Sequence, residues 1–94
     1  MSLPPAFLDE LRSRLSLAQV AGRKVIWDMR KSNQGKGDWW APCPLHQEKS
    51  ASFHVDDRKG FYYCFGCHAK GDMISFVRET ENVSFMEALE ILTR

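Results

Sequence analysis

Two pairs of soft ligands constrain this chain more than any other feature of its sequence. Cys43 and His46 enclose two residues in C-P-L-H, and Cys64 and Cys67 enclose two residues in C-F-G-C. Zinc takes four ligands in a tetrahedron, and a pair with this spacing lets one tight turn supply half of them. The two pairs use all 3 cysteines of the chain. We therefore predict one structural Zn²⁺ ion held by these residues.

Disulfide, redox and catalytic uses of these cysteines agree less well with the sequence. An odd number of cysteines without a preceding apolar signal segment does not suit a disulfide framework. A thioredoxin-type C-x-x-C lies at a strand-to-helix junction, whereas aromatic, strand-forming residues precede Cys64. Four protein ligands leave no position for a catalytic water. The metal is expected to hold the fold and to do no chemistry.

The size and charge of the chain suit a small metal-stabilised domain. At 94 residues, an apolar core alone is marginal and a metal adds stability. The net charge is +1, but residues 22–37 are basic and the last residues from position 79 are rich in glutamate. The basic segment indicates either a polyanion-facing side or an ordinary solvated surface. No apolar run is long enough to span a membrane, and reduced thiols suit the cytoplasm.

Helical patterns lie at both ends of the chain. Pro4 and Pro5 suit a first helical turn, and Ser16 and Gly22 are placed to begin and end a second, shorter helix. Near the C-terminus we expect one helix from Gly71 and Asp72 to Asn82, and another from a capping box formed by Ser84 and Glu87. The apolar positions of these four helices are Phe7, Leu8, Leu11, Leu15, Leu17, Ala18, Val20, Ala21, Met73, Ile74, Phe76, Val77, Phe85, Ala88, Leu89 and Leu92.

Strand patterns fill the middle of the chain. Residues 25–27 and 38–40 are predicted to pair as a hairpin around a basic, turn-rich loop, and residues 51–55 and 61–65 as a second hairpin. The pattern predicts an α+β fold, with an antiparallel sheet of about four or five strands flanked by N-terminal and C-terminal helices. The last helical pattern still runs at Arg94, so we expect a longer parent protein.

Three runs resemble the N-terminal zinc-binding domain of bacterial DNA primases, a CHC2-type zinc ribbon. They are A-P-C-P-L-H-Q-E-K-S-A-S-F-H-V from Ala41, F-Y-Y-C-F-G-C-H-A-K-G-D from Phe61 and S-F-M-E-A from Ser84. The resemblance covers about residues 6–94. It implies that residues 1–94 form one zinc-ribbon domain at the N-terminus of a longer primase, with Cys43, His46, Cys64 and Cys67 as its zinc set.

The resemblance also implies a function in DNA replication. Such a domain binds single-stranded DNA and presents this template to a separate catalytic domain, a nucleotidyltransferase that makes RNA primers. The acidic motifs of that catalytic domain are not found in this sequence, so the chain alone is expected to be inactive. The implied partners are the template strand, the primase catalytic domain and, through the full-length protein, the replicative helicase. The implied location is the bacterial cytoplasm, at the replication fork.

Two further histidines, His54 and His68, lie outside the predicted zinc set. His68 departs from the family pattern, which commonly has glycine after the last cysteine, and it is expected to adopt a positive φ with an exposed side chain. Its position next to Cys67 is a poor one for an additional ligand. His54 follows Phe53 in a predicted strand, so one of these two side chains points inward and the other outward.

Single-strand binding is consistent with the residues themselves, because unpaired bases stack on aromatic rings and phosphates attract cations. Alternation places Phe61, Tyr63 and Phe65 on one face of the sheet and Tyr62 on the other, without showing which face meets DNA. Any one aromatic side chain can instead belong to the core. Trp40, Tyr62 and Phe65 are further aromatics of the sheet, and the predicted DNA-binding residues are Arg23, Lys24, Lys31, Lys36, Trp39, Lys49, Phe53, Arg58, Lys59, Phe61, Tyr63 and Lys70.

A second function from another class is also compatible with the sequence. The chain can be a zinc-ribbon interaction module whose exposed sheet or acidic last helix binds protein in a replication or transcription assembly. The basic segment at residues 22–37 and the close match of the three runs favour the DNA-binding function.

Overall fold

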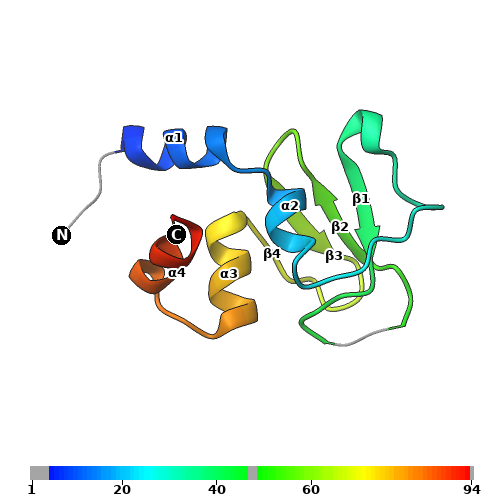
Figure 1. The fold of residues 1–94 in the computed structure, drawn as a ribbon. Coiled ribbons are helices and arrows are strands. Elements are labelled where there is room, and N and C mark those ends of the chain that lie inside the picture. The colour runs from blue at the N-terminus through cyan, green and yellow to red at the C-terminus, as the bar shows by residue number, and fades with distance from the viewer. Residues whose placement is uncertain (1–4, 47–48, 94) are drawn as a thin grey trace.

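A four-stranded antiparallel sheet forms the centre of the fold (Figure 1). The computed structural model describes residues 5–46 and 49–93. The predicted α+β architecture, an antiparallel sheet with helices before and after it in the sequence, is confirmed. The elements are α1 (Pro5–Arg14), α2 (Leu17–Ala21), the 3₁₀ turn η1 (Gln34–Lys36), β1 (Asp38–Ala41), β2 (Phe53–Asp56), β3 (Phe61–Cys64), β4 (Lys70–Gly71), α3 (Met73–Glu81) and α4 (Phe85–Leu92).

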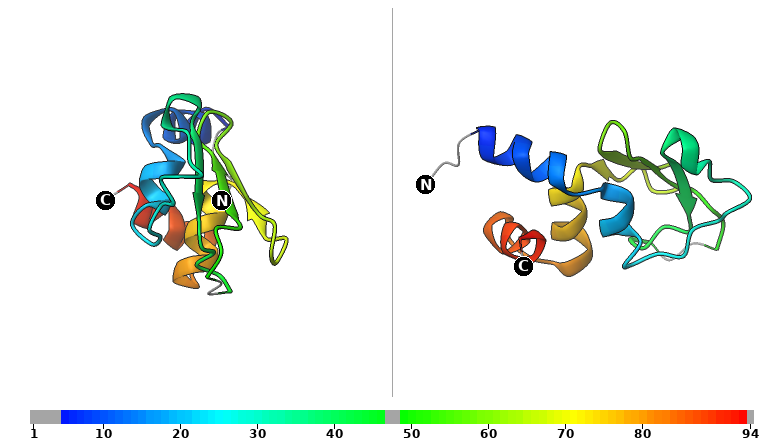
Figure 2. Two further views of the ribbon diagram at one scale, coloured as in Figure 1. Left: turned by 90° about the vertical axis from the view of Figure 1, so that its right-hand side faces the viewer. Right: turned by 45° about the horizontal axis from the view of Figure 1, so that its top comes forward.

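The strands follow one another in the order β1-β2-β3-β4, and their register sorts the side chains into two faces. Ala41, Phe53 and Cys64 form one cross-strand row of buried residues. The next row, in which Trp40 pairs with His54 and His54 with Tyr63, points to the opposite face because side chains alternate along a strand. Helices α2 and α3 cover only the face that carries Phe53 (Figures 1 and 2). No helix formed by residues 5–46 or 49–93 lies over the other face.

The core lies between this sheet face and the helices. Phe53 and Tyr62 from the sheet contact Phe76 from α3, with ring centroids 5.9 and 5.7 Å apart. Aromatic pairs of this kind add to the free energy gained by burial. The buried residues of the core are Leu11, Leu17, Ala18, Val20, Ala21, Cys43, Phe53, Val55, Tyr62, Cys64, Met73, Ile74, Phe76, Val77, Ala88, Leu89 and Leu92.

Helix α2 is tied to the sheet by the Asp57 carboxylate. This carboxylate accepts hydrogen bonds from the Ser16 hydroxyl at 2.9 Å and from the backbone N–H of Ala18 at 3.0 Å. Ser16 caps α2 and Gly22 follows its last residue, as the sequence predicted. The first turn of α2 is thereby fixed against the connection between β2 and β3.

The two C-terminal helices begin at the predicted caps. The Asp72 side chain accepts a hydrogen bond from the Ser75 N–H at 2.9 Å, and Ser84 and Glu87 form a complete capping box. Asn82 ends α3 in the left-handed conformation. The guanidinium of Arg12 donates to Asp72 at 3.0 Å, so the start of α3 is also bound to α1.

Asp72→Ala is expected to lower the free energy of unfolding by about 1 kcal/mol, because the α3 cap is lost. Burial acts to raise the pKa of Asp72, but the Ser75 N–H and Arg12 outweigh it and hold the pKa below 3.8. The stability that the carboxylate adds is therefore present above its ordinary pKa and is lost as pH falls through the lower folded-state pKa.

Urea unfolding between pH 7 and pH 2 measures this effect. Asp72→Asn keeps an oxygen that can cap α3, but its free energy of unfolding should fall less between pH 7 and pH 2 than that of the wild type, because the titrating carboxylate is gone. The control is Asp9→Ala, which removes an exposed carboxylate 3.8 Å from the same Arg12 and should change stability by less than about 0.5 kcal/mol. Equal stability of Asp72→Ala and the wild type would contradict the assigned cap.

The predicted strand at residues 25–27 is wrong. Ile26 is 87% exposed, and the segment has no regular secondary structure. The outer edge of β1 therefore has no strand partner from residues 25–27, and isolated hydrogen bonds satisfy its backbone at Trp40. Ser32 Oγ accepts from the Trp40 N–H at 2.9 Å, and the Asp28 N–H donates to the Trp40 carbonyl at 2.7 Å. The fourth strand is β4, which was not predicted because it has only two residues.

Two apolar positions of the predicted helices are exposed, and two more, Leu8 and Leu15, are half-buried. Phe7 and Phe85 are 38% and 37% exposed. A hollow of about 160 Å³ between Phe7, Leu11 and Thr93 separates part of α1 from α4, so these helices cover one another incompletely. Pro4, expected in the first helical turn, lies outside the described residues. Among the helices that the structure describes, none combines the length and hydropathy needed to cross a bilayer.

Candidate metal centre

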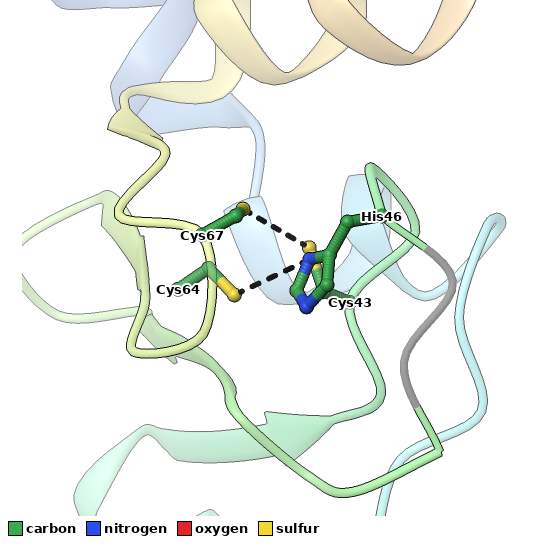
Figure 3. Close-up of side chains that lie close together, drawn as sticks. All are labelled: Cys43, His46, Cys64 and Cys67. Carbon is green, nitrogen blue, oxygen red and sulfur yellow. Dashed lines mark hydrogen bonds between the residues drawn. The ribbon is translucent and has the colours of Figure 1, made fainter.

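The four predicted ligands come together at one end of the sheet. Cys43 and His46 lie in the connection after β1, Cys64 is the last residue of β3, and Cys67 lies in the turn that follows. Their ligand atoms all lie within 4.8 Å of one another. The Sγ atoms of Cys43 and Cys67 are 4.0 Å apart, and Cys64 Sγ is 3.8 Å from His46 Nδ1 (Figure 3).

These distances fit a tetrahedral zinc site. Zn–S bonds of about 2.3 Å place the sulfur atoms of an ideal tetrahedron about 3.8 Å apart. Three thiolates and one imidazole form a closed donor set that is typical of structural zinc. The group therefore fits one structural zinc ion, which would join the connection after β1 to the connection after β3.

Backbone and hydroxyl donors surround the cluster and favour thiolate at Cys64. Burial acts to raise the pKa of Cys64, but N–H groups of Cys67 and Gly66 and the Ser52 hydroxyl outweigh it and lower the pKa from 9.0 to about 7. The Gly66 N–H lies 3.3 Å from the sulfur and the Ser52 hydroxyl 3.6 Å. These donors favour the charge state that binds the metal.

Cys43 differs because burial dominates its environment. Burial raises the pKa of Cys43 from 9.0 to about 12, although the backbone N–H of Leu45 acts in the opposite direction from 3.4 Å. Zinc binding must displace the proton from this thiol, and metal binding is accordingly coupled to proton release.

The turn after Cys64 brings Cys67 back to the cluster. The His68 N–H donates to the Cys64 carbonyl at 2.8 Å, and the Cys64 N–H donates to the Ala69 carbonyl at 2.8 Å. His68 has φ 67°, as predicted, and its exposed ring bonds to the Tyr63 hydroxyl at 2.9 Å. His68 is thus held on the Tyr63 side of the turn, outside the ligand group.

Aromatic side chains cross the helix-free face of the sheet. The Trp40 ring lies 4.5 Å from the His54 ring and 5.6 Å from Phe65, which lies 4.8 Å from Tyr63. Lysines flank these rings: Lys31 Nζ is 4.1 Å from the Trp40 ring centroid, and Lys70 pairs with Tyr63 across β3 and β4. We name this set the open-face row; it consists of Lys31, Trp40, His54, Tyr63, Phe65 and Lys70.

An acidic pair lies beside the row on the same face. Asp38 and Asp56 face each other across β1 and β2, and Phe61 pairs with Asp56. The carboxylate of Asp38 contacts His54 Nε2. These carboxylates repel phosphate, because like charges repel, and the cations Arg58 and Lys59 of the turn between β2 and β3 lie at the same end of the sheet.

The structure divides the predicted DNA-binding residues between the two sides of the sheet. Tyr63, Lys70 and Lys31 belong to the open-face row. Phe53 is 0% exposed in the core, so it offers no ring to a base, and Trp39 is on the helix-covered face, where it packs against Trp27 with ring centroids 5.2 Å apart. The strand register, which was not known from the sequence, decides this placement: it excludes Phe53 as a stacking surface and puts the half-buried Trp39 on the side opposite the open-face row.

The cations of the basic segment at residues 22–37 also lie in different parts of the molecule. Lys24 pairs with Glu81 of α3 at 2.5 Å, and Arg23 lines a hollow beside α2. Both lie on the helix-covered side. Lys36 lies close to the turn between β2 and β3 that carries Arg58 and Lys59, because Arg58 donates to the Gly35 carbonyl at 2.6 Å. Lys49 is exposed in the connection between β1 and β2.

Three residues of the row were absent from the predicted DNA-binding set: Trp40, His54 and Phe65. Strand alternation was the available signal, since Phe65 shares the face of Tyr63. The register between β1 and β2, which places Trp40 beside His54, depends on contacts distant in sequence and has no local signal.

A small antiparallel sheet closed by two turn-borne ligand pairs defines a zinc ribbon. The sequence profile described as the CHC2 zinc finger matches residues 3–94, and the chain belongs to this family.

Curated relatives and a solved structure agree with this assignment. The chain is 48% identical over 85 residues to a DNA primase of Helicobacter pylori strain J99 and 42% identical over 88 residues to a DNA primase of Rickettsia bellii. These matches cover 90% and 94% of the chain but 14% of each relative. The crystal structure of the Aquifex aeolicus primase, comprising its zinc binding and RNA polymerase domains, matches with TM-score 0.75 and 30% identity over 92% of this chain and 20% of that chain.

Proposed function

We propose that this chain is the zinc-binding, template-recognition domain of a DNA primase and that it binds single-stranded DNA on the open-face row. The observation that carries the proposal is the helix-free face itself. It presents Trp40, Tyr63 and Phe65 with Lys31 and Lys70 on either side. Stacking surfaces combined with cations are the features that single-strand binding uses.

The dimensions of the row support a short binding site. Three inter-strand spacings separate β1 from β4, about 14 Å in total. In this proposal the template runs across the strands, bases stack on the rings of Trp40 and Phe65, and the two lysines contact phosphates. Lys36, Lys49, Arg58 and Lys59 are candidates for further phosphate contacts outside the row, and Phe61 for a further stacking contact.

The zinc ion has an indirect role in this proposal. Cys64 follows Tyr63 directly, and Phe65 follows Cys64, so two rings of the row are attached to the zinc-bearing turn. A fixed turn holds these rings in place before DNA arrives, which lowers the entropic cost of binding. The four protein ligands would leave zinc no direct role in a reaction.

The parent protein in this proposal is a primase. Its catalytic domain would polymerise ribonucleotides on the template, this chain would be inactive by itself, and the replicative helicase would act through the full-length protein. The relatives named DNA primase support this proposal, since this chain matches them over most of its own length. The setting would be the bacterial cytoplasm at the replication fork.

A salt titration tests the DNA-binding proposal. Fluorescence anisotropy with the zinc-loaded chain should show binding to single-stranded oligonucleotides, and the logarithm of the affinity should fall linearly with that of the salt concentration. Two phosphate contacts give a slope of about −1.4, because single strands release about 0.7 counterion per contact. Absence of binding at low salt would contradict the proposal.

Exposed apolar residues on α4 favour protein binding as the second candidate function. Met86 is 56% exposed, next to Phe85 and the acidic Glu87. An apolar surface with an acidic rim suits a basic protein partner. A chain that fails to bind single strands yet binds such a protein would support the interaction-module function instead.

A further inference from the structure

A hollow on the helix-covered side of the molecule is not used by the proposed template site. It lies beside α2 and has a volume of about 500 Å³. Gln19, Arg23, Trp27, Trp39 and Asp57 contribute to its lining. Trp39 points away from the open-face row, because it pairs with Val55 of the core and alternates with Trp40. The hollow and the row are thus on opposite sides of β1.

Two indoles form an aromatic wall in this hollow. The Trp27 and Trp39 rings are tilted by 47° with centroids 5.2 Å apart, and both side chains are half-buried. Neither indole N–H has a hydrogen-bond partner among residues 5–46 and 49–93. The wall therefore offers π-surface for stacking and N–H donors for a polar ligand.

Charged groups of both signs, Arg23 and Asp57, line the hollow beside these indoles. The Arg23 guanidinium forms no ion pair or hydrogen bond within the described part of the chain, whereas the neighbouring Lys24 is paired with Glu81. Asp57 is held by Ser16 and Ala18, and a carboxylate can accept further hydrogen bonds. Gln19 adds an exposed amide, which can donate and accept.

We propose that this hollow binds a nucleotide, with the base against Trp27 and Trp39 and the phosphate at Arg23. An aromatic wall suits a base, an uncommitted guanidinium suits a phosphate, and a fixed carboxylate suits a ribose hydroxyl or a base amino group. An acidic peptide would use Arg23 but would leave the paired indoles and the carboxylate without a complementary group. The site lies apart from the template row and does not depend on it.

The three tryptophans allow a direct test by ¹H–¹⁵N NMR of the zinc-loaded chain. Titration with ATP or GTP should shift the indole N–H signals of Trp27 and Trp39 and leave that of Trp40 unchanged. Arg23→Ala should weaken ATP binding by about tenfold, as expected for loss of a charge-assisted hydrogen bond, while adenosine binding should be unaffected. Lys24→Ala, which removes the adjacent cation, is the matched control and should bind ATP as the wild type does.

A second comparison identifies the source of the nucleotide. Shifts of Trp27 and Trp39 with ATP but not with a 5′-phosphorylated dinucleotide would assign the site to free nucleotides, and the reverse would assign it to a chain end; both support the proposal. No indole shift with millimolar ATP, GTP or dinucleotide would overturn it. Shifts confined to Trp40 would overturn it as well, and so would equal affinity of Arg23→Ala and the wild type for whichever of these nucleotides shifts Trp27 and Trp39.

Discussion

Removal of zinc is expected to unfold the sheet, and Cys64→Ser should do the same by removing one ligand. Binding of structural zinc contributes on the order of 10 kcal/mol, which is comparable to the whole stability of a small domain. Cys64 is the last residue of β3 and belongs to the core, so its loss also disturbs the strand that carries Tyr62. Circular dichroism and thermal unfolding, before and after chelation, measure the effect.

His68→Ala is the matched control for this prediction. His68 lies close to the cluster in sequence but outside the ligand group, and its ring contacts Tyr63. The variant should retain one zinc ion per chain and a stability close to that of the wild type. Native spectra of the chain after complete removal of the metal would show that zinc is dispensable for the fold.

Trp40→Ala is expected to weaken single-strand binding by about 1–3 kcal/mol, roughly 5- to 150-fold, because one stacking platform is lost. The Trp40 ring is the centre of the row, in contact with His54, Phe65 and Lys31. Lys31→Ala should weaken binding to all sequences and reduce the salt dependence, as expected for a phosphate contact. Anisotropy titrations at two salt concentrations separate these two effects.

Lys24→Ala is the control for the lysine substitution. Lys24 belongs to the same basic segment as Lys31, but it pairs with Glu81 on the other side of the sheet. Its removal should leave the DNA affinity nearly unchanged. If Lys24→Ala and Lys31→Ala weakened binding equally, net charge and not the open-face row would account for DNA binding.

Much of the fold could be predicted from sequence signals that involve only a few neighbouring residues. Ser16, Asp72 and Ser84 cap helices where the sequence predicted them, because a cap depends on bonds spanning three residues. The ligand pairs at Cys43 and Cys64 were also predictable, since each pair occupies one turn. In both cases the physical cause is local.

Features that depend on distant contacts were not predictable in the same way. Residues 25–27 have the composition of a strand, but Ser32 and Asp28 occupy the β1 edge by other bonds. Phe53 and Trp40 are both aromatic strand residues, and only the register of β1 with β2 shows that one belongs to the core and the other to the open face. Because a shift of one residue exchanges the two faces, sequence patterns alone could not assign these side chains to the core or to the open face.

The central claim, that template DNA lies on the open-face row, is tested most directly by an NMR titration of the zinc-loaded chain with a short single-stranded oligonucleotide. The backbone amide signals of Trp40, His54, Tyr63 and Lys70 should shift together with one affinity, and those of α1 and α4 should not. Shifts confined to α1 and α4, with the four row amides unchanged, would contradict the claim.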